Sequence, residues 1–194
     1  MVLFRVCILV GNGVEELDFI GVYEVLCDVR KVSSYGLDVK TVVYRGPDRV
    51  VCGNGLVILP HEIVDDFSRC DVLVIPGGRR FVEESFSNRE LLDSIRRFYE
   101  EGGFIASVCT GSLILAKAGL LRGRKATTHH LRIDMLRELG AYPVRERIVV
   151  SDRIVTAAGI SASVDLGLKL VEILCGVEIS HRVREYIEYI GDGS

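Results

Sequence analysis

Short apolar runs alternate with longer stretches in which apolar and polar positions recur with helical spacing. The apolar runs are bounded by glycine, proline or asparagine and are rich in β-branched residues, which is typical of buried strands. They lie at residues 2–10, 37–44, 71–75 and 104–108, with shorter strand segments at 126–128 and on either side of Ser151-Asp152 within 148–155. Gly53-Asn54-Gly55 separates two apolar halves of residues 50–59, which predicts a hairpin there.

The intervening stretches predict helices. Apolar residues three and four apart give each of them one buried face, and glycine or charged residues mark several of their ends. The predicted helices cover residues 15–29, 88–101, 111–118, 131–139, 162–175 and 178–189.

Strands that alternate with helices in this way predict one α/β domain. Its sheet is expected to be doubly wound and mostly parallel, with helices on both faces, as in flavodoxin-like folds. The domain is expected to span residues 1–190, and residues 191–194 are expected to form a frayed tail. Functional sites in such sheets lie at the carboxyl ends of strands. Loops 11–18, 76–80 and 109–112 follow predicted strands and are therefore expected to converge.

The most informative of these loops follows the strand at 104–108. Ser107-Val108-Cys109-Thr110-Gly111 has a nucleophile between small residues at minus two and plus two, as in a nucleophile elbow. The small neighbours allow the strand and the next helix to pass closely. The positive end of that helix favours the thiolate form of Cys109, so the sequence predicts a reactive thiol with a lowered pKa. The alternative is a structural cysteine at a strand end.

Composition narrows the choice of function. The 194 residues are 48% hydrophobic with a formal net charge of −3, which is typical of a globular protein with a large core. Lysine and arginine are dispersed, so a nucleic-acid surface is not expected. Six cysteines stand far apart, which argues against a zinc site or a small disulfide scaffold. All of them except Cys109 are expected to be small buried residues.

Two apolar segments raise the question of a membrane. Residues 1–10 carry Arg5 and continue into a glycine turn, which suits a first strand better than a signal peptide. Residues 104–121 are long enough to span a bilayer, but they contain the elbow and Lys117. We therefore expect a cytoplasmic protein that has no membrane contact.

Several motifs resemble the ThiJ/PfpI superfamily of class I glutamine amidotransferase-like proteins, and the likeness covers the whole chain. They are Glu16-Leu-Asp-Phe-Ile-Gly21, Val74-Ile-Pro-Gly-Gly78, Val108-Cys-Thr-Gly-Ser112 and Ala118-Gly-Leu-Leu121 with the residues up to His129. The isonitrile hydratase branch is the most similar. The resemblance implies a homodimer and a cofactor-free enzyme of the lyase type, without metal, that acts on a small electrophilic substrate.

The resemblance also implies residue roles. Cys109 is similar to the nucleophile and Asp18 to the acid beside it, which is aspartate in the hydratase branch and glutamate in most others. Thr110 follows the cysteine as in hydratases. Backbone N–H groups of Gly78 or Gly77, together with Thr110, match the oxyanion hole. Because peptidase relatives have histidine where Thr110 stands, intracellular cysteine peptidase activity is disfavoured.

The sequence departs from the hydratase pattern near the expected pocket. Val22 replaces a usual proline, His130 replaces a usual tryptophan, and Arg79 and Arg80 stand where a further glycine is common. These differences leave the substrate open. Glyoxalase or deglycase chemistry, or a redox-responsive chaperone whose Cys109 is oxidised to sulfinate, are the alternatives.

For several individual residues the sequence leaves two roles open. Asp18 is either the active-site acid or a helix N-cap, for which aspartate is a preferred residue. His129 is either a catalytic partner of the cysteine or part of the pocket wall. Arg79 and Arg80 either clamp an anionic substrate or form a solvated loop pair.

Overall fold

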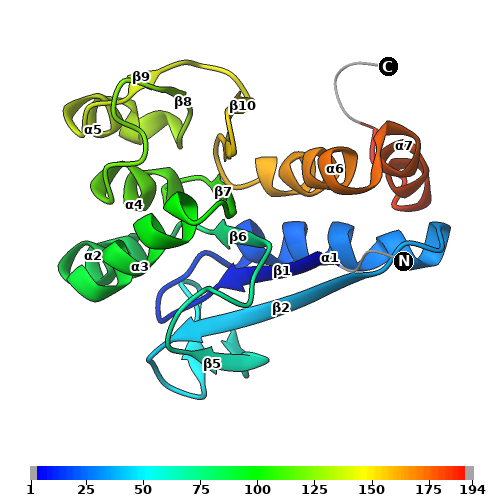
Figure 1. The fold of residues 1–194 in the computed structure, drawn as a ribbon, viewed down its shortest axis with the longest axis horizontal. Helices are drawn as coiled ribbons and strands as arrows, with labels where there is room; N and C mark the ends of the chain where they lie inside the picture. Colours follow the sequence, from blue (N-terminus) through cyan, green and yellow to red (C-terminus); the bar gives the residue numbers. More distant parts are fainter. Residues whose placement is uncertain (1–3, 191–194) are drawn as a thin grey trace.

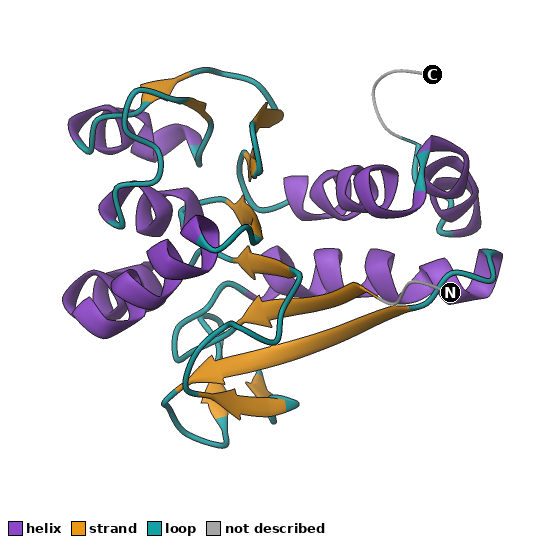
Figure 2. Cartoon of the chain, in the orientation of Figure 1, coloured by secondary structure: helices purple, strands orange, loops and turns teal. Residues whose placement is uncertain are grey.

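The structure is a computed structural model that describes residues 4–190, in which strands and helices alternate along the chain (Figures 1 and 2). The strands are β1 (Phe4–Leu9), β2 (Leu37–Tyr44), β3 (Val50–Val51), β4 (Val57–Ile58), β5 (Glu62–Val64), β6 (Val72–Ile75), β7 (Phe104–Val108), β8 (Lys125–Ala126), β9 (Tyr142–Pro143), β10 (Ile148–Ser151) and β11 (Ile154–Ala157). The helices are α1 (Glu16–Val32), α2 (Arg79–Ser87), α3 (Arg89–Glu100), α4 (Gly111–Lys117), the 3-10 helix η1 (His130–Arg132), α5 (Ile133–Glu138), α6 (Ala162–Cys175) and α7 (Val177–Tyr186). The tail predicted at 191–194 lies outside the described residues.

Seven strands form the central sheet, in the order β10-β11-β7-β6-β1-β2-β5. Every neighbouring pair is parallel except β10 with β11 at one edge, so the predicted mostly parallel sheet is confirmed. The chain runs outward from β1 through β2 to β5 and then returns to β6 on the other side of β1. The topological switch point therefore lies between β1 and β6, where doubly wound folds place their ligands.

Three short elements were not predicted: helix α2, strand β5 and the two-residue strand β9. Helix α2 lies where the sequence predicted a loop at Arg79 and Arg80. It was not predicted because only three of its nine residues are buried, too few to show a helical repeat of apolar positions. The two arginines pair with Glu83 and Glu84 one turn later, which supports this short helix. Strand β5 has three residues at the sheet edge, too few for the alternation that marks a strand in a sequence.

The helices fall into two groups on the sheet. Helices α1, α6 and α7 pack against one another, and α2, α3, α4 and α5 form the other group (Figure 1). Glycines allow α1 and α6 to approach closely: a Cβ on Gly21 would lie 2.2 Å from the Ser163 hydroxyl oxygen, and one on Gly167 would lie 2.7 Å from the Val25 Cβ. This contact fixes the position of α1 and of any side chain on its first turns.

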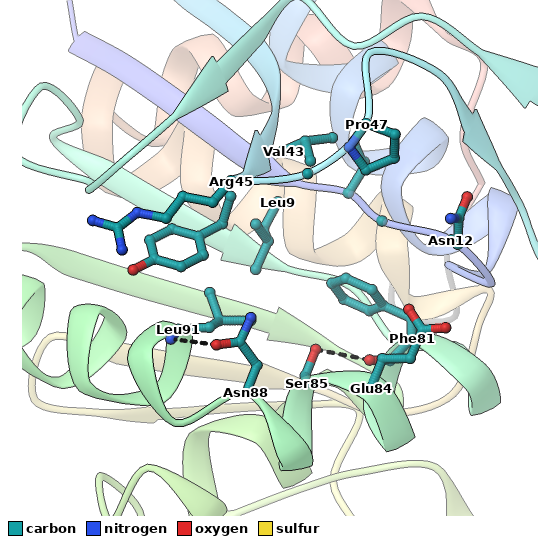
Figure 3. Close-up of a pocket in the computed structure, with 14 residues that line it drawn as sticks. Leu9, Asn12, Val43, Arg45, Pro47, Phe81, Glu84, Ser85, Asn88 and Leu91 are labelled. Atoms are coloured by element: carbon teal, nitrogen blue, oxygen red, sulfur yellow. Dashed lines mark hydrogen bonds between the residues drawn. The ribbon is translucent and has the colours of Figure 1, made fainter.

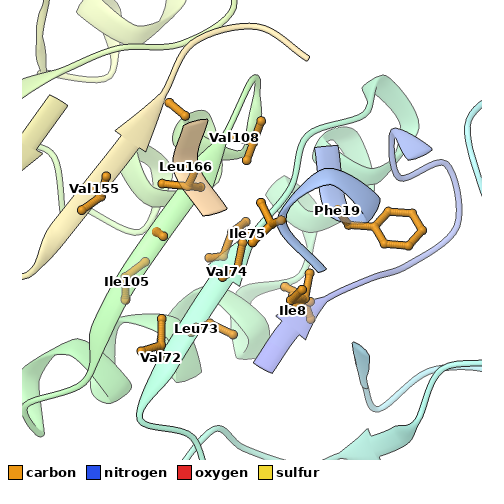
Figure 4. Packing of buried hydrophobic residues seen from close by; sticks show 14 of the residues in the cluster. Ile8, Phe19, Val72, Leu73, Val74, Ile75, Ile105, Val108, Val155 and Leu166 are labelled. Carbon is orange, nitrogen blue, oxygen red and sulfur yellow. The ribbon is translucent and has the colours of Figure 1, made fainter. Parts of the chain in front are cut away.

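The core lies around the two strands at the centre of the sheet. All four residues of β6 are buried, and Ile105 and Val108 of β7 are fully buried beside them (Figure 4). Side chains packed at this density leave the strand ends little freedom, so the loops that follow β6 and β7 start from rigid points. None of the helices between residues 4 and 190 combines the length and apolar character that a bilayer crossing requires.

The expectation that the five cysteines other than Cys109 are small buried residues holds for Cys7 and Cys52, whereas Cys27, Cys70 and Cys175 are only partly buried. Two of the five are also paired, which the sequence did not indicate. Cys7 in β1 and Cys70, just before β6, form a disulfide across 63 residues of sequence. Their spacing carried no signal, because only the parallel pairing of β1 with β6 brings them together. Disulfides are uncommon in reducing compartments, so the cytoplasmic location remains a prediction that this bond does not favour.

We expect Cys70→Ala to destabilise the protein. The disulfide closes a loop of 63 residues, and constraining the unfolded chain over that length contributes up to about 4 kcal/mol. Urea unfolding without reductant should show the loss, whereas Cys175→Ala, which removes an unpaired thiol, should unfold like the wild type. An identical midpoint for wild type with and without dithiothreitol would show that the bond adds no stability.

Candidate active site

The elbow predicted from the sequence is present between β7 and α4. Cys109 has a φ of 54°, a left-handed backbone conformation that is uncommon outside glycine. A Cβ on Gly111 would lie 2.0 Å from the carbonyl oxygen of Ile75, so only glycine fits at plus two. The turn is held by the Cys109 carbonyl, which accepts hydrogen bonds from the hydroxyls of Ser112 (3.1 Å) and Thr128 (2.9 Å).

Asp18 lies beside this elbow and is fully buried. The N-cap of α1 is Glu15, so the interpretation of Asp18 as a helix cap is wrong. One carboxylate oxygen, Oδ2, accepts a hydrogen bond from the Gly77 N–H at 2.8 Å. The other, Oδ1, has no hydrogen-bond partner within residues 4–190, and the Cys109 side chain lies close enough to the carboxyl to act on its pKa.

Burial controls the protons of this pair. It raises the pKa of the Asp18 carboxyl from 3.8 to about 7, against the opposing effect of the Gly77 N–H. Burial, and then the negative charge of Asp18, raise the pKa of the Cys109 thiol to about 12. The predicted lowering of the thiol pKa is therefore wrong for the free protein, because burial outweighs the seven-residue helix α4. Between about pH 7 and pH 12 the pair holds one proton.

The backbone donors expected for an oxyanion hole lie in the right loop but are already engaged. The Gly77 N–H donates to Asp18, and the Gly78 N–H donates to the Thr110 hydroxyl oxygen at 3.1 Å. A Cβ on Gly77 would lie 2.5 Å from that hydroxyl oxygen and 2.8 Å from Asp18 Oδ2, so glycine is required for this close approach. Rotation of the Thr110 side chain would free the Gly78 N–H.

A fourth loop, between β11 and α6, was missed in the sequence. Cys109 donates its N–H to the carbonyl of Ala158 at 2.8 Å, and the backbone N–H of Ile160 acts to lower the pKa of the Cys109 thiol. The signal was available, since this loop also follows a strand at the same end of the sheet. Arg147 fixes the loop through hydrogen bonds to the Ser161 carbonyl (3.0 Å) and Asp165 (2.6 Å).

The histidines lie at the margin of this site. His129 Nδ1 accepts a hydrogen bond from the Leu131 N–H at 3.3 Å, and its ring stacks on the exposed His130 with centroids 4.5 Å apart. Burial, together with His130 and Arg132, lowers the pKa of His129. A Cβ on Gly159 would lie 3.1 Å from its ring, so the His129 side chain packs against the loop between β11 and α6. These contacts favour the wall role over that of a catalytic partner.

Arg79 and Arg80 both border a hollow beside the loop that follows β1, and Arg79 also borders the hollow beside Thr110, so their role as a substrate clamp stays a prediction. Their side chains are 85% and 63% exposed, and each forms an ion pair with a glutamate four residues later. Helix α2 turns them outward because its buried positions are Phe81, Val82 and Ser85.

A hollow of about 520 Å³ is bordered by Gly13, Glu15, Cys52, Arg79 and Arg80. Two smaller hollows also lie near the carboxyl ends of the strands. One, of about 210 Å³, lies between the ends of β1 and β2 and helix α2, where Leu9, Val43 and Phe81 form apolar walls (Figure 3). It does not include Cys109. A second hollow of about 170 Å³ is bordered by Thr110, directly after the nucleophile.

Comparison with known proteins agrees with this geometry. Isonitrile hydratase of Pseudomonas putida is 36% identical over 176 residues, which cover 91% of this chain and 74% of that protein. The glutathione-independent glyoxalase DJR-1.2 of Caenorhabditis elegans is 29% identical over 71% of this chain and 75% of its own. The crystal structure of a ThiJ/PfpI family protein from Pseudomonas syringae superimposes with a TM-score of 0.85 at 31% identity, covering 99% of this chain and 77% of that one.

The mostly parallel sheet, its switch point and the elbow cysteine define a class I glutamine amidotransferase-like α/β protein. The model of the DJ-1/PfpI family matches residues 4–173. The chain belongs to the DJ-1/PfpI family.

The raised pKa of Asp18 makes stability depend on pH. Between about pH 4 and pH 7 the folded protein keeps a proton that the unfolded chain has lost, so the free energy of unfolding falls as pH rises, by at most about 4 kcal/mol. In Asp18→Asn, whose amide oxygen still accepts from Gly77, this slope should disappear. Urea unfolding at several pH values checks this, with the exposed Asp48→Asn as control. Parallel pH profiles for wild type and Asp18→Asn would contradict it.

Proposed function

We propose that this protein hydrates a small electrophilic substrate with Cys109 as nucleophile and Asp18 as acid, without a cofactor. Isonitrile hydration to an N-substituted formamide is the leading case. The observation that carries the proposal is the buried carboxyl beside the elbow sulfur, with a pKa near neutrality. The P. putida hydratase at 36% identity supports the substrate class.

The proton shared by Cys109 and Asp18 allows one group to act as nucleophile and the other as acid. When the proton lies on Asp18, the sulfur is an anion that faces the N–H groups of Thr110 and Ile160. The thiolate bonds to the isonitrile carbon while Asp18 gives its proton to the same carbon, which forms a thioimidate. Water then adds across the C=N bond. Breakage of the C–S bond releases the formamide and returns the thiolate, while the hydroxyl proton of the tetrahedral intermediate passes to the Asp18 carboxylate. The net reaction consumes one water and regenerates both groups.

The Thr110 side chain has a part in the second step. Turning its hydroxyl away from Gly78 would expose a backbone N–H next to the nucleophile. That N–H would stabilise the oxygen of the tetrahedral intermediate. Valine has nearly the same volume as threonine but no hydroxyl, so Thr110→Val is a suitable probe of this role.

Glyoxalase chemistry is the second candidate, and the 29% identical C. elegans glyoxalase favours it. There the thiolate would add to the aldehyde carbon of a glyoxal to form a hemithioacetal. The same acid would then move protons between the two carbon centres. A redox sensor would instead be modified once per Cys109, so repeated turnover separates both enzymes from it.

We expect Cys109→Ala to abolish turnover of isonitriles and glyoxals. Asp18→Asn should lower kcat/KM by about 10²- to 10⁴-fold, since the acid is lost while the Gly77 hydrogen bond is retained. Steady-state assays with a panel of both substrate classes check this, with Cys175→Ala as control. Full activity in Asp18→Asn would refute the acid role, and stoichiometric modification without turnover would favour the redox alternative.

We also propose that the protein is a homodimer. Glu16 accepts hydrogen bonds from Asn54 and Leu56, which places the β3–β4 hairpin against the start of α1. This leaves an apolar surface that is exposed in the single chain. Its residues are Leu17, Ile20, Val51, Leu56 and Val57. A contiguous apolar surface of this kind is typical of an interface between subunits.

Leu17→Lys should therefore shift the protein toward the monomer. Leu17 is 44% exposed, and a lysine there would place a charge in the proposed interface. Ile173→Lys is the matched control, since Ile173 on α6 is 40% exposed outside this surface. Light scattering at micromolar concentration measures the mass. A monomeric wild type would contradict the homodimer, and a dimeric Leu17→Lys would contradict this interface.

A further inference from the structure

The hollow beside Thr110 has an apolar interior and a charged rim. It lies between α2, α4 and the η1–α5 segment. It is lined by Val82, Phe86, Leu113 and Met135, with Arg79, Glu83 and Arg132 at the rim. We propose that this hollow receives the substrate's chain and that Arg132 binds a carboxylate at the end of that chain. The inference rests on the proposed function, because it names the substrate of the same site.

Thr110 connects the hollow to the nucleophile. It borders the hollow and directly follows Cys109, and its hydroxyl accepts from the Gly78 N–H. The hollow is thus a place next to the nucleophile that can hold the chain of a substrate whose reactive carbon lies on the sulfur. Val82 and Leu113 are buried and give the hollow a fixed floor, whereas Phe86 and Met135 are partly exposed and form its walls.

The size of the hollow limits the chain. Its volume of about 170 Å³ holds on the order of five or six groups of the size of a water molecule. An unbranched chain of about five or six carbon atoms fills it. Because the lining is apolar, a hydrocarbon chain gains free energy by leaving water.

The charges at the rim decide what stands at the end of the chain. Glu83 is already paired with Arg79, with 3.2 Å between Oε1 and Nε. The Arg132 side chain has no ion pair or hydrogen bond to any residue in the range 4–190. The rim thus carries one uncompensated positive charge. A guanidinium binds a carboxylate through two parallel hydrogen bonds, so a monoanionic chain end fits this position.

The first test compares two substrates that differ only at the chain end. They are an n-alkyl isonitrile and the isonitrile of equal length that ends in a carboxylate. Wild type should process the carboxylated one with a kcat/KM about tenfold higher, and Arg132→Gln should remove that preference while the alkyl substrate is unaffected. Arg137→Gln is the matched control: it is an exposed arginine in α5, paired with Asp134, and does not line the hollow.

The second test measures binding without turnover. Cys109→Ala protein is titrated calorimetrically with the ω-carboxylated alkyl formamide, the product analogue, and with the uncharged alkyl formamide. The carboxylated ligand should bind about tenfold more tightly, and adding Arg132→Gln should equalise the two. Equal affinities before the substitution would overturn the proposal. Tight binding of the carboxylated ligand in a protein whose wild type turns over neither isonitrile would instead leave this site standing and overturn the hydratase function.

Discussion

The Asp18 carboxyl is buried against the Cys109 sulfur, and the rest of the site is arranged around that contact. A buried carboxylate without full hydrogen bonding is costly, so the carboxyl retains a proton up to about pH 7. The same burial opposes a free thiolate, and neither group loses its proton independently of the other. The elbow strains the backbone at Cys109, and the pair holds one proton in the range where the proposed chemistry needs an acid and a nucleophile together.

Packing far from the sulfur makes this contact possible. Gly21 and Gly167 allow α1 to lie close to α6, which sets where the first turn of α1 places Asp18. Gly77 allows the β6–α2 loop to come within reach of both Asp18 and Thr110. Each of these glycines lies on a different segment, and each is required because a side chain would occupy space that another segment fills. The disulfide between Cys7 and Cys70 joins β1 to the chain just before β6, the two strands that flank the switch point.

The environment of the site is more enclosed than that of an ordinary reactive thiol. Backbone N–H groups, a buried acid and a small hollow replace bulk water around the sulfur. Arg79 and Arg80, to which the sequence drew attention, are exposed and form ion pairs with glutamates of the same helix. In the proposed substrate site the unpaired cation at the rim is Arg132, from a different segment. Under that proposal, substrate selection depends on how helices α2, α4 and α5 meet.

Several features of this protein followed from its sequence alone. Alternation of β-branched runs with amphipathic stretches was enough to predict the parallel sheet, because burial on both faces leaves a continuous apolar signature. The elbow was visible because its steric demand for small neighbours is local. The helix α2, the strand β5 and the disulfide carried no local signal, whereas the loop at Ile160 followed a predicted strand and was missed. The protonation of the pair also could not be predicted: the helix end at Cys109 suggested a low pKa, and only the assembled structure shows that burial and Asp18 raise it. Tertiary structure decides such properties because desolvation and charge depend on which segments surround a group, and those segments lie far apart in the chain.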